Sequence, residues 1–347
     1  MPYPLKVMKV LVTGSAGFIG FHTVNELIEQ GFDVVGLDNI NDYYSPQLKY
    51  ARLLEAGIEQ EFIKWYKPVQ SIKCPAYRFV RMNLEDKQQL FSLFQEEKFD
   101  YVINLAAQAG VRYSIENPDV YVQSNIVGFH YILEACRNFP PKHLVHASSS
   151  SVYGANAKIP FSEEDKVDSP VSLYAATKKS NELMAHAYSH LYSIPITCLR
   201  FFTVYGPWGR PDMAPMLFAK AITEGKPIKV FNNGNMERDF TYVGDIVNGV
   251  VKTMKTIFSE KPEYRVLNIG NGAPVNLMEF IRQLGKELKK DVLSEFLPMQ
   301  AGDVQKTWAD QTMFVKITNT EFNKTLEKGI NEFVIWYINF FIYEKIN

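Results

Sequence analysis

The sequence predicts an α/β fold in which a doubly wound parallel sheet carries a smaller α/β substrate-binding cap domain. Three observations predict it. Short β-branched apolar runs alternate with helical stretches, a glycine-rich turn directly follows the first run, and the alternation loosens into shorter pieces after residue 203. The chain has 347 residues, of which 46% are hydrophobic, so it can bury one large core or two adjoining ones.

The first unit of the fold is a strand, a turn, a helix and a second strand. Residues 7–13 form a nearly continuous apolar run, as expected of a strand buried on both faces. Helical periodicity covers 22–30, and a second apolar run at 33–37 ends in Asp38. This order is that of a dinucleotide-binding βαβ unit, so the sheet is expected to be of the Rossmann type.

The glycines of this unit have separate roles. Gly14 permits the tight turn, Gly17 lets backbone N–H groups approach a pyrophosphate, and Gly20 lets the helix lie close to the sheet. Asp38 is placed to accept hydrogen bonds from the adenosine ribose and would repel a 2′-phosphate. The unit therefore favours NAD over NADP.

The alternation continues along the first half of the chain. Strands are predicted at 77–82, 101–105, 144–147 and 196–201, and helices at 46–56, 86–97, 122–137 and 174–192. Ligands of such sheets bind outside the carboxyl ends of the strands. The connection 39–74 has no assigned role, and surface elaboration is its plain interpretation.

The second half of the chain predicts the cap domain. Helices are predicted near 216–224, from Asp245 as N-cap to 255, and from 277, with strands at 228–231, 240–243 and 265–269. We assign 1–203 to the dinucleotide-binding domain, with 240–269 returning to it, and 204–239 and 270–347 to the substrate domain.

A tyrosine and a lysine form the candidate catalytic pair. Tyr174 and Lys178 are four residues apart and share one face of the predicted helix. An ammonium beside a phenol favours the phenolate and lowers a pKa that is otherwise near ~10. A serine at the end of the preceding strand can share the same substrate hydroxyl. These groups are suited to removing a proton from an alcohol.

Composition excludes several classes of partner. The net charge of −1 gives no field that would gather nucleic acid or anionic lipid. Three well-separated cysteines suit a reducing compartment, and the six histidines lack ligand-like spacing, so we expect no metal. The N-terminus lacks signal-peptide features, and the apolar segment 333–343 is too short to span a bilayer. We expect a cytoplasmic protein whose last segment packs on the body or at a subunit interface.

Together, the glycine turn, the serine-rich strand end and the Tyr-x-x-x-Lys motif make the chain similar to the extended short-chain dehydrogenase/reductase superfamily. The resemblance covers nearly the whole length and is closest to the UDP-glucuronate 4-epimerases. The segments that carry it are 38–44, 106–114, 148–154, 201–214, 238–243 and 300–303. It implies NAD as the cofactor, a UDP-sugar substrate and a homodimer formed through two helices of each nucleotide domain.

The resemblance also implies roles for single residues. Tyr174 is the general base, Lys178 lowers its pKa and holds the nicotinamide ribose, and Ser149 shares the proton of the sugar 4-hydroxyl. The implied cofactor residues are Gly14, Gly17, Phe18, Ile19, Gly20, Asp38, Asn39, Asn83, Leu84, Ala106, Ala107, Asn125, Tyr174 and Lys178. The UDP part is expected at Arg238 and Asp303. Two departures from the family pattern are Asn83, where Asp is usual, and Asn104, where His is usual.

Two serines separate the possible outcomes of a 4-keto intermediate. The related dehydratases carry Asp and Glu at the positions of Ser150 and Ser151, and the decarboxylases carry Glu at the second. Serine is no general acid or base near neutral pH without help, so hydride return and inversion at C4 are favoured. The expected reaction is the conversion of UDP-glucuronate to UDP-galacturonate through a transient 4-keto sugar.

Further residues are expected to contact the substrate. Arg210 is a candidate for a charge-assisted bond to the uronate carboxylate, and Arg112 is a weaker candidate that also suits a solvated surface. Thr203 and Gln300 differ from the residues usual in UDP-galactose epimerases. Tyr153 and Tyr205 are interpreted as packing residues, and Trp208 either closes over substrate or packs its loop.

Three alternatives remain open from the sequence. The first is an epimerase of another UDP-hexose. The second is a decarboxylase or net oxidoreductase of a nucleotide sugar, and the third is a non-catalytic NAD-sensing protein. Catalytic use of NAD without CO2 release separates the epimerases from the second alternative. The presence of Ser149, Tyr174 and Lys178 disfavours the third.

Overall fold

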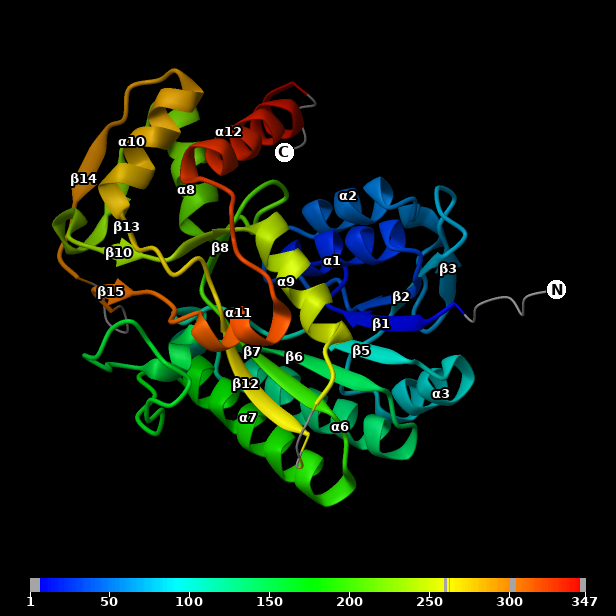
Figure 1. The fold of residues 1–347 in the computed structure, drawn as a ribbon. Helices are drawn as coiled ribbons and strands as arrows, with labels where there is room; N and C mark the ends of the chain where they lie inside the picture. Colours follow the sequence, from blue (N-terminus) through cyan, green and yellow to red (C-terminus); the bar gives the residue numbers. More distant parts are fainter. Residues whose placement is uncertain (1–6, 259–260, 262, 300–303, 344–347) are drawn as a thin grey trace.

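An eight-stranded sheet lies at the centre of the larger part of the chain (Figure 1). The computed structural model describes residues 7–258, 261, 263–299 and 304–343. The strand order is β12-β7-β6-β5-β1-β2-β4-β3, and every pairing is parallel except that of β3 with β4. The strands are β1 (Lys9–Thr13), β2 (Asp33–Asp38), β3 (Pro68–Gln70), β4 (Tyr77–Arg81), β5 (Tyr101–Asn104), β6 (His143–Ser149), β7 (Ile196–Phe201) and β12 (Tyr264–Ile269). The order reverses between β1 and β5, where a doubly wound sheet opens a ligand crevice.

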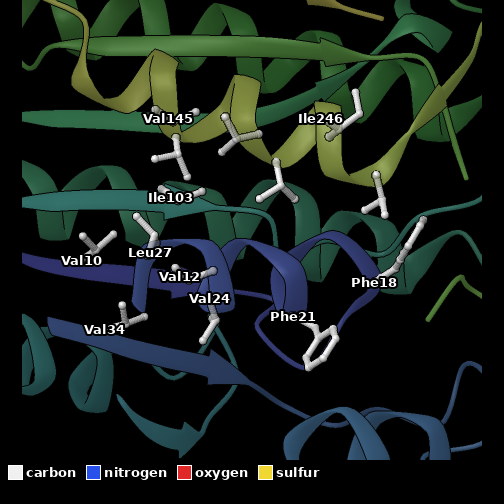
Figure 2. Packing of buried hydrophobic residues seen from close by; sticks show 14 of the residues in the cluster. Val10, Val12, Phe18, Phe21, Val24, Leu27, Val34, Ile103, Val145 and Ile246 are labelled. Atoms are coloured by element: carbon white, nitrogen blue, oxygen red, sulfur yellow. The ribbon is translucent and has the colours of Figure 1, made fainter. Parts of the chain in front are cut away.

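Helices cover both faces of this sheet (Figure 1). One face carries α1 (Phe18–Glu29) and α9 (Val243–Lys255), whose apolar side chains join those of β1 and β2 in one core. Figure 2 shows part of that core, with Val24 and Leu27 of α1 lying over the sheet residues Val10 and Val12. The other face carries α3 (Lys87–Glu97), α6 (Gly128–Asn138) and α7 (Leu173–Tyr192) over a second core.

The smaller part of the chain has its own core beside the carboxyl ends of the strands. It contains α8 (Ala214–Thr223), α10 (Leu277–Leu288) and α12 (Leu326–Tyr337) packed around Phe280 and Phe333. Short strands complete it: β9 (Ile228–Val230) pairs with β14 (Ser294–Phe296), and β10 (Glu237–Arg238) lies between β13 (Val275–Asn276) and β15 (Lys306–Thr307). This part forms one wall of the crevice.

Two segments pass between the parts. β8 (Thr203–Tyr205) pairs with β11 (Phe240–Tyr242), and α9 and β12 then return the chain to the large sheet. These pairings support the division into 1–203 with 240–269 and 204–239 with 270–347, which we keep as a proposal. None of the helices formed by the described residues has the length and apolar character needed to cross a bilayer.

The structure corrects two expectations about helices. Asp245 is not an N-cap, because β11 runs straight into α9 and Tyr242 takes that position; the Asp245 carboxylate instead accepts a hydrogen bond from the Lys324 N–H at 3.1 Å. The helix expected over 122–137 is present, but its first part, 122–127, is a π-helix that continues directly into α6. Asn125 is buried in that wider turn, where its side chain accepts a hydrogen bond from the Gln108 N–H in the loop after β5.

The connection 39–74 and the C-terminal segment both pack against the body of the protein. The connection contributes α2 (Gln47–Glu55), whose Lys49 and Arg52 are buried, and the edge strand β3. At the C-terminus, Trp336 and Phe340 pack on Trp208, with ring centroids 5.5 and 4.8 Å away. The terminal helix therefore packs on the body, and the packing of Trp208 holds its loop.

Candidate active site

A cavity of about 460 Å³ lies at the carboxyl ends of the large sheet and against the smaller part of the chain. It brings together most of the residues expected to bind ligands. These are Gly14, Gly17, Phe18, Ile19, Gly20, Asp38, Asn39, Leu84, Ala106, Ala107, Ser149, Ser150, Ser151, Tyr174, Lys178, Thr203, Arg210 and Arg238. Residues predicted to bind cofactor and residues predicted to bind substrate therefore line one continuous space.

Four expected residues are not placed in the lining. Asn125 lies behind it, where its amide accepts from the Gln108 N–H (2.8 Å) and donates to the Gln108 carbonyl (3.0 Å). Asn125 thus holds the loop after β5 in place. Arg112 is exposed, with its guanidinium 5.2 Å from the ring centroid of Phe231. Asp303, like Gln300, lies outside the described residues.

Asn83 is the fourth, because its side chain is engaged locally. Its amide donates to the Asp86 carboxylate at 3.1 Å and accepts from the Asn39 amide at 3.3 Å. Asp86 also accepts from the Asn83 backbone N–H, so a loop cap fixes the orientation of this amide. Its neighbour Leu84 lines the cavity in its place.

The glycine turn forms a cradle with no space for side chains. Gly14 has φ = +71°, and a Cβ there would lie 2.8 Å from the Ala106 nitrogen. A Cβ on Gly17 would lie 2.9 Å from the Gly14 carbonyl oxygen, and one on Gly20 would collide with the same oxygen. The turn therefore lets the N-terminus of α1, with its free N–H groups, face the cavity. This arrangement fits a dinucleotide pyrophosphate.

The acid at the end of β2 is held for a ribose. The Asp38 carboxylate accepts from the Ala16 N–H at 3.2 Å and from the Ile40 N–H at 2.8 Å. A neighbour that was not predicted from the sequence is Lys49, whose ammonium is 3.7 Å from Asp38 Oδ1 and donates to Asn41 Oδ1 at 2.7 Å. Lys49 lines the cavity from α2, and only the tertiary packing of the 39–74 connection reveals it.

The catalytic pair lies on the first turns of α7. The Ser172 hydroxyl accepts from the Ala175 N–H at 3.2 Å, so α7 begins just before Tyr174. Lys178 follows one turn later and donates to the Ala147 carbonyl at 2.7 Å. Ser149, at the end of β6, accepts from the Ser151 N–H at 3.1 Å. The three candidate catalytic side chains therefore meet where β6 ends and α7 begins.

The electrostatics of this pair differ from the sequence expectation. Burial raises the pKa of Tyr174, while a hydrogen bond from Ser149 and the charge of Arg210 oppose the rise. Burial also lowers the pKa of Lys178 to about 8. The Lys178 ammonium is bonded to the Ala147 carbonyl and lies 6.0 Å from the Tyr174 ring centroid. Its effect on the pKa of Tyr174 remains a prediction.

A charged cluster closes the substrate side of the cavity. The Arg210 Nε donates to Asp212 Oδ1 at 3.0 Å, and the Tyr43 hydroxyl donates to Asp212 Oδ2 at 3.0 Å. Burial lowers the pKa of Arg210, but the charge and hydrogen bonds of Asp212 outweigh burial and raise it. Arg210 is thus a permanent cation held by one edge. At the far end, Arg238 Nη1 donates to the Glu237 and Gln305 carbonyls, each at 3.0 Å.

Comparison with known proteins now identifies the family. The model of the NAD dependent epimerase/dehydratase family matches residues 10–270. The chain belongs to this family.

Individual relatives agree with this assignment. The chain is 48% identical over 348 residues to Protein CapI of Staphylococcus aureus, covering 96% of this chain and 99% of that protein. It is 44% identical over 345 residues to the Probable UDP-glucuronate 4-epimerase of Rhizobium meliloti (strain 1021), covering 95% and 97%. The crystal structure of UDP-glucuronic acid 4-epimerase from Bacillus cereus in complex with UDP-glucuronic acid and NAD superposes with a TM-score of 0.84 at 32% identity, covering 96% of this chain and 99% of that one.

Membership in the family makes NAD the cofactor of this cavity, and the residues present fit it. The glycine cradle and Asp38 both line this cavity, and their chemistry suits a pyrophosphate and a ribose respectively. The departure at Asn104 also has a physical account: its amide oxygen accepts from the Thr13 hydroxyl, and its amide nitrogen lies 3.0 Å from His146 Nδ1. Asn104 therefore braces β1 and β6 beneath the cofactor site.

A buried ion pair, which the sequence did not reveal, lies behind the catalytic residues of this family member. Glu182 of α7 accepts from Arg200 Nε at 2.8 Å and from the Ser148 hydroxyl at 2.7 Å. Arg200 Nη1 also donates to the Tyr153 hydroxyl at 2.9 Å, which in turn donates to Asn268 at 2.7 Å. Tyr153 is therefore a hydrogen-bonding partner as well as a packing residue. The network ties α7, β6 and β12 together directly beneath Ser149.

Within the described part of the chain, no group of three His, Cys, Asp or Glu side chains has the arrangement of a metal site.

Proposed function

We propose that this chain interconverts UDP-glucuronate and UDP-galacturonate by epimerisation at C4 of the sugar, with bound NAD and a transient 4-keto intermediate. Membership in the epimerase family and the similarity to proteins named as UDP-glucuronate 4-epimerases support it. The roles that we give to single residues below are part of the proposal.

The observation that supports the proposal most is that serines, and not acids, line the cavity at the end of β6. Ser150 and Ser151 line the cavity directly after Ser149, at the positions where a dehydratase or decarboxylase needs acids. The Ser151 hydroxyl is buried and has no hydrogen-bond partner among the described residues. Leaving a hydroxyl in that state costs about 1–3 kcal/mol, and a carboxylate in the cavity would relieve the cost.

Each chemical step has a residue placed for it. Tyr174 takes the proton of the sugar 4-hydroxyl, with Ser149 sharing the hydrogen bond, and later returns it. NAD, when bound, supplies a reversible acceptor for the C4 hydride, so net redox is nil. Thr203 and Arg210 line the same cavity and hold the carboxylate together with the two serines. We assign Arg238, which also lines the cavity, to the UDP part.

The carboxylate contacts would also protect the intermediate from decarboxylation. Oxidation at C4 of a glucuronate produces a β-keto acid, which readily loses CO2. We propose that the two serines, Thr203 and Arg210 hold the carboxylate in an orientation that disfavours C–C cleavage. Without an acid at Ser151, no residue at that position protonates the carbon left by CO2 loss.

The direct test is incubation of the purified protein with UDP-glucuronate and separation of the products by chromatography. Appearance of UDP-galacturonate without added NADH supports the proposal. Conversion of UDP-glucose or UDP-N-acetylglucosamine with no turnover of UDP-glucuronate contradicts it and favours epimerisation of another UDP-hexose. Stoichiometric NADH or a UDP-pentose as the main product favours a net oxidoreductase or decarboxylase.

We also propose a homodimer formed through α6 and α7. Leu183 and Leu191 are exposed apolar residues of α7, on the face of the large sheet that the smaller part of the chain leaves uncovered. Light scattering that gives the mass of one chain contradicts this. A cytoplasmic location is proposed on the three free cysteines, which suit a reducing compartment.

A further inference from the structure

Three arginines lie near the active site, and one of them, the fully buried Arg52, has no counter-ion among the described residues. Arg200 pairs with Glu182 and Arg210 pairs with Asp212. Arg52, on α2, is completely shielded from solvent, yet among the described residues none of its partners carries a negative charge. This difference between otherwise similar side chains requires an explanation.

Every N–H of the Arg52 guanidinium has a neutral acceptor. Nε and Nη2 donate to the Trp208 carbonyl at 3.2 and 2.7 Å, and Nη2 also donates to the Gly209 carbonyl at 3.3 Å. Nη1 donates to the Ala16 carbonyl at 2.9 Å and to the Tyr44 hydroxyl at 3.0 Å. These are five bonds from five donors, so hydrogen bonding is complete while the charge stays uncompensated.

The titratable neighbour of Arg52, His22, does not compensate the positive charge of the guanidinium. His22, its neighbour on α1, bonds through Nε2 to the Pro207 carbonyl at 2.9 Å. Burial, and to a smaller degree the charge of Arg52, lower the pKa of His22 to about 4, so the imidazole is neutral at physiological pH. An isolated buried charge is costly, and dipoles offset only part of the cost. A fold that retains such a cation gains when an anion binds beside it.

The two sides of Arg52 belong to the two ligand sites. Ala16 precedes Gly17, the N-cap of α1, where the pyrophosphate cradle is built. Trp208 and Gly209 precede Arg210, which lines the substrate side of the cavity. One turn earlier on the same helix, Lys49 reaches Asp38. The connection 39–74 thus contributes two buried cations near the glycine turn: Lys49 lines the cavity, and Arg52 lies behind the lining.

We propose that Arg52 is a positioning residue for NAD: it fixes the glycine turn against the substrate loop, and it maintains a positive charge that the cofactor's pyrophosphate neutralises. Arg52 is not in the lining of the cavity, so it acts through the turn and through its field, without touching the cofactor. The inference rests on NAD binding and not on the identity of the sugar.

Binding measurements on variants test the proposal. Arg52→Gln keeps amide donors but removes the charge. Arg52→Lys keeps the charge but removes the planar guanidinium and its set of five donors. Arg265→Met is the control. Arg265 is a half-buried arginine on β12 whose described hydrogen bonds also go to neutral groups, the hydroxyls of Thr197 and Thr256. The readouts are NAD content after purification, the NAD dissociation constant from calorimetry, and Tm with and without NAD.

We expect Arg52→Gln to raise the NAD dissociation constant at least about tenfold, or about 1.4 kcal/mol. Arg52→Lys should bind within about threefold of wild type, and Arg265→Met should be unchanged. The Tm gain on adding NAD should shrink in Arg52→Gln, whereas a merely structural role would lower Tm and leave the gain intact. Wild-type affinity in Arg52→Gln overturns the proposal. If that variant does not fold, a tenfold loss in Arg52→Lys overturns the role of the charge.

Discussion

The hydrogen bond between Ser148 and Glu182 offers a sharp test of the network beneath the catalytic residues. The chain supplies a matched control in Ser189. Both serines are buried, at 3% and 1% exposure, and Ser189 lies on α7 like Glu182. The Ser148 hydroxyl donates to the Glu182 carboxylate at 2.7 Å, whereas the Ser189 hydroxyl has no partner among the described residues. Replacing each by Ala removes the same atom from two different contexts.

The expected magnitudes follow from these contacts. A hydrogen bond to a charged group contributes about 1.5–3 kcal/mol. Glu182 keeps both bonds from Arg200 after the change, so the lower end of that range is expected for Ser148→Ala. Ser189→Ala removes a buried hydroxyl without a described partner, so we expect its free energy of unfolding to rise, by up to about 1–3 kcal/mol. Urea unfolding of both variants measures the difference.

The same substitution should change catalysis. Ser148 precedes Ser149 on β6, and its bond to Glu182 helps to hold this strand end against α7, together with the bond from Lys178 to the Ala147 carbonyl. Loosening one tie misaligns Ser149 and Tyr174, so kcat should fall about tenfold, or about 1.4 kcal/mol, with KM nearly unchanged. Equal stability and equal kcat in Ser148→Ala and Ser189→Ala would refute the positioning role.

Three further predictions concern the charges of the site. Glu182→Gln strands the buried Arg200 charge and should cost about 3–5 kcal/mol, while the double change Glu182→Leu with Arg200→Met should cost less, as urea unfolding can show. Arg210→Ala and Ser151→Ala should raise the fraction of UDP-pentose among the products, and an unchanged fraction with activity retained contradicts the carboxylate clamp. Burial lowers the pKa of Lys178 to about 8 from its usual 10.5, so between these values the unfolded chain binds the extra proton and this lysine makes stability rise with pH. Relative to Lys178→Met, wild type should gain stability from pH 8 to pH 10, and a constant difference excludes the shift.

Features with local sequence signals could be predicted correctly. The Rossmann-type sheet and the cofactor turn depend on periodicity and on glycines within one βαβ unit, and the structure has both. The approach of Tyr174 to Ser149 needed only the rule that parallel strands present their carboxyl ends to one ligand crevice. The cofactor contact of Asn83 stays a prediction, and the bond from its amide to Asp86, three residues later, is a local feature that the sequence prediction did not include.

Features made by distant segments could not be predicted. Arg52 contacts Trp208 across 156 positions, and no residue type or spacing in the 39–74 connection announces that contact. The direction of the Tyr174 pKa shift is another case, because it depends chiefly on how deeply the phenol is buried. Pairwise spacing on a helix gives proximity but not the competing bonds that each partner makes.

Two buried polar groups that are incompletely compensated in the ligand-free fold indicate which ligands the cavity binds. Among the described residues, the Ser151 hydroxyl has no hydrogen-bond partner and the Arg52 guanidinium has no counter-ion, so the first would be satisfied by an acceptor and the second by a nearby anion. These groups differ in chemistry and in place: Ser151 lines the cavity, whereas Arg52 lies behind the lining and is bonded to the glycine turn. A dinucleotide pyrophosphate at the glycine turn and a carboxylate-bearing sugar at the end of β6 would compensate one each. Because Arg52 also bonds the carbonyls of Trp208 and Gly209, the first ligand stabilises the loop that carries Arg210 toward the second. Binding of NAD should therefore precede and strengthen recognition of the uronate.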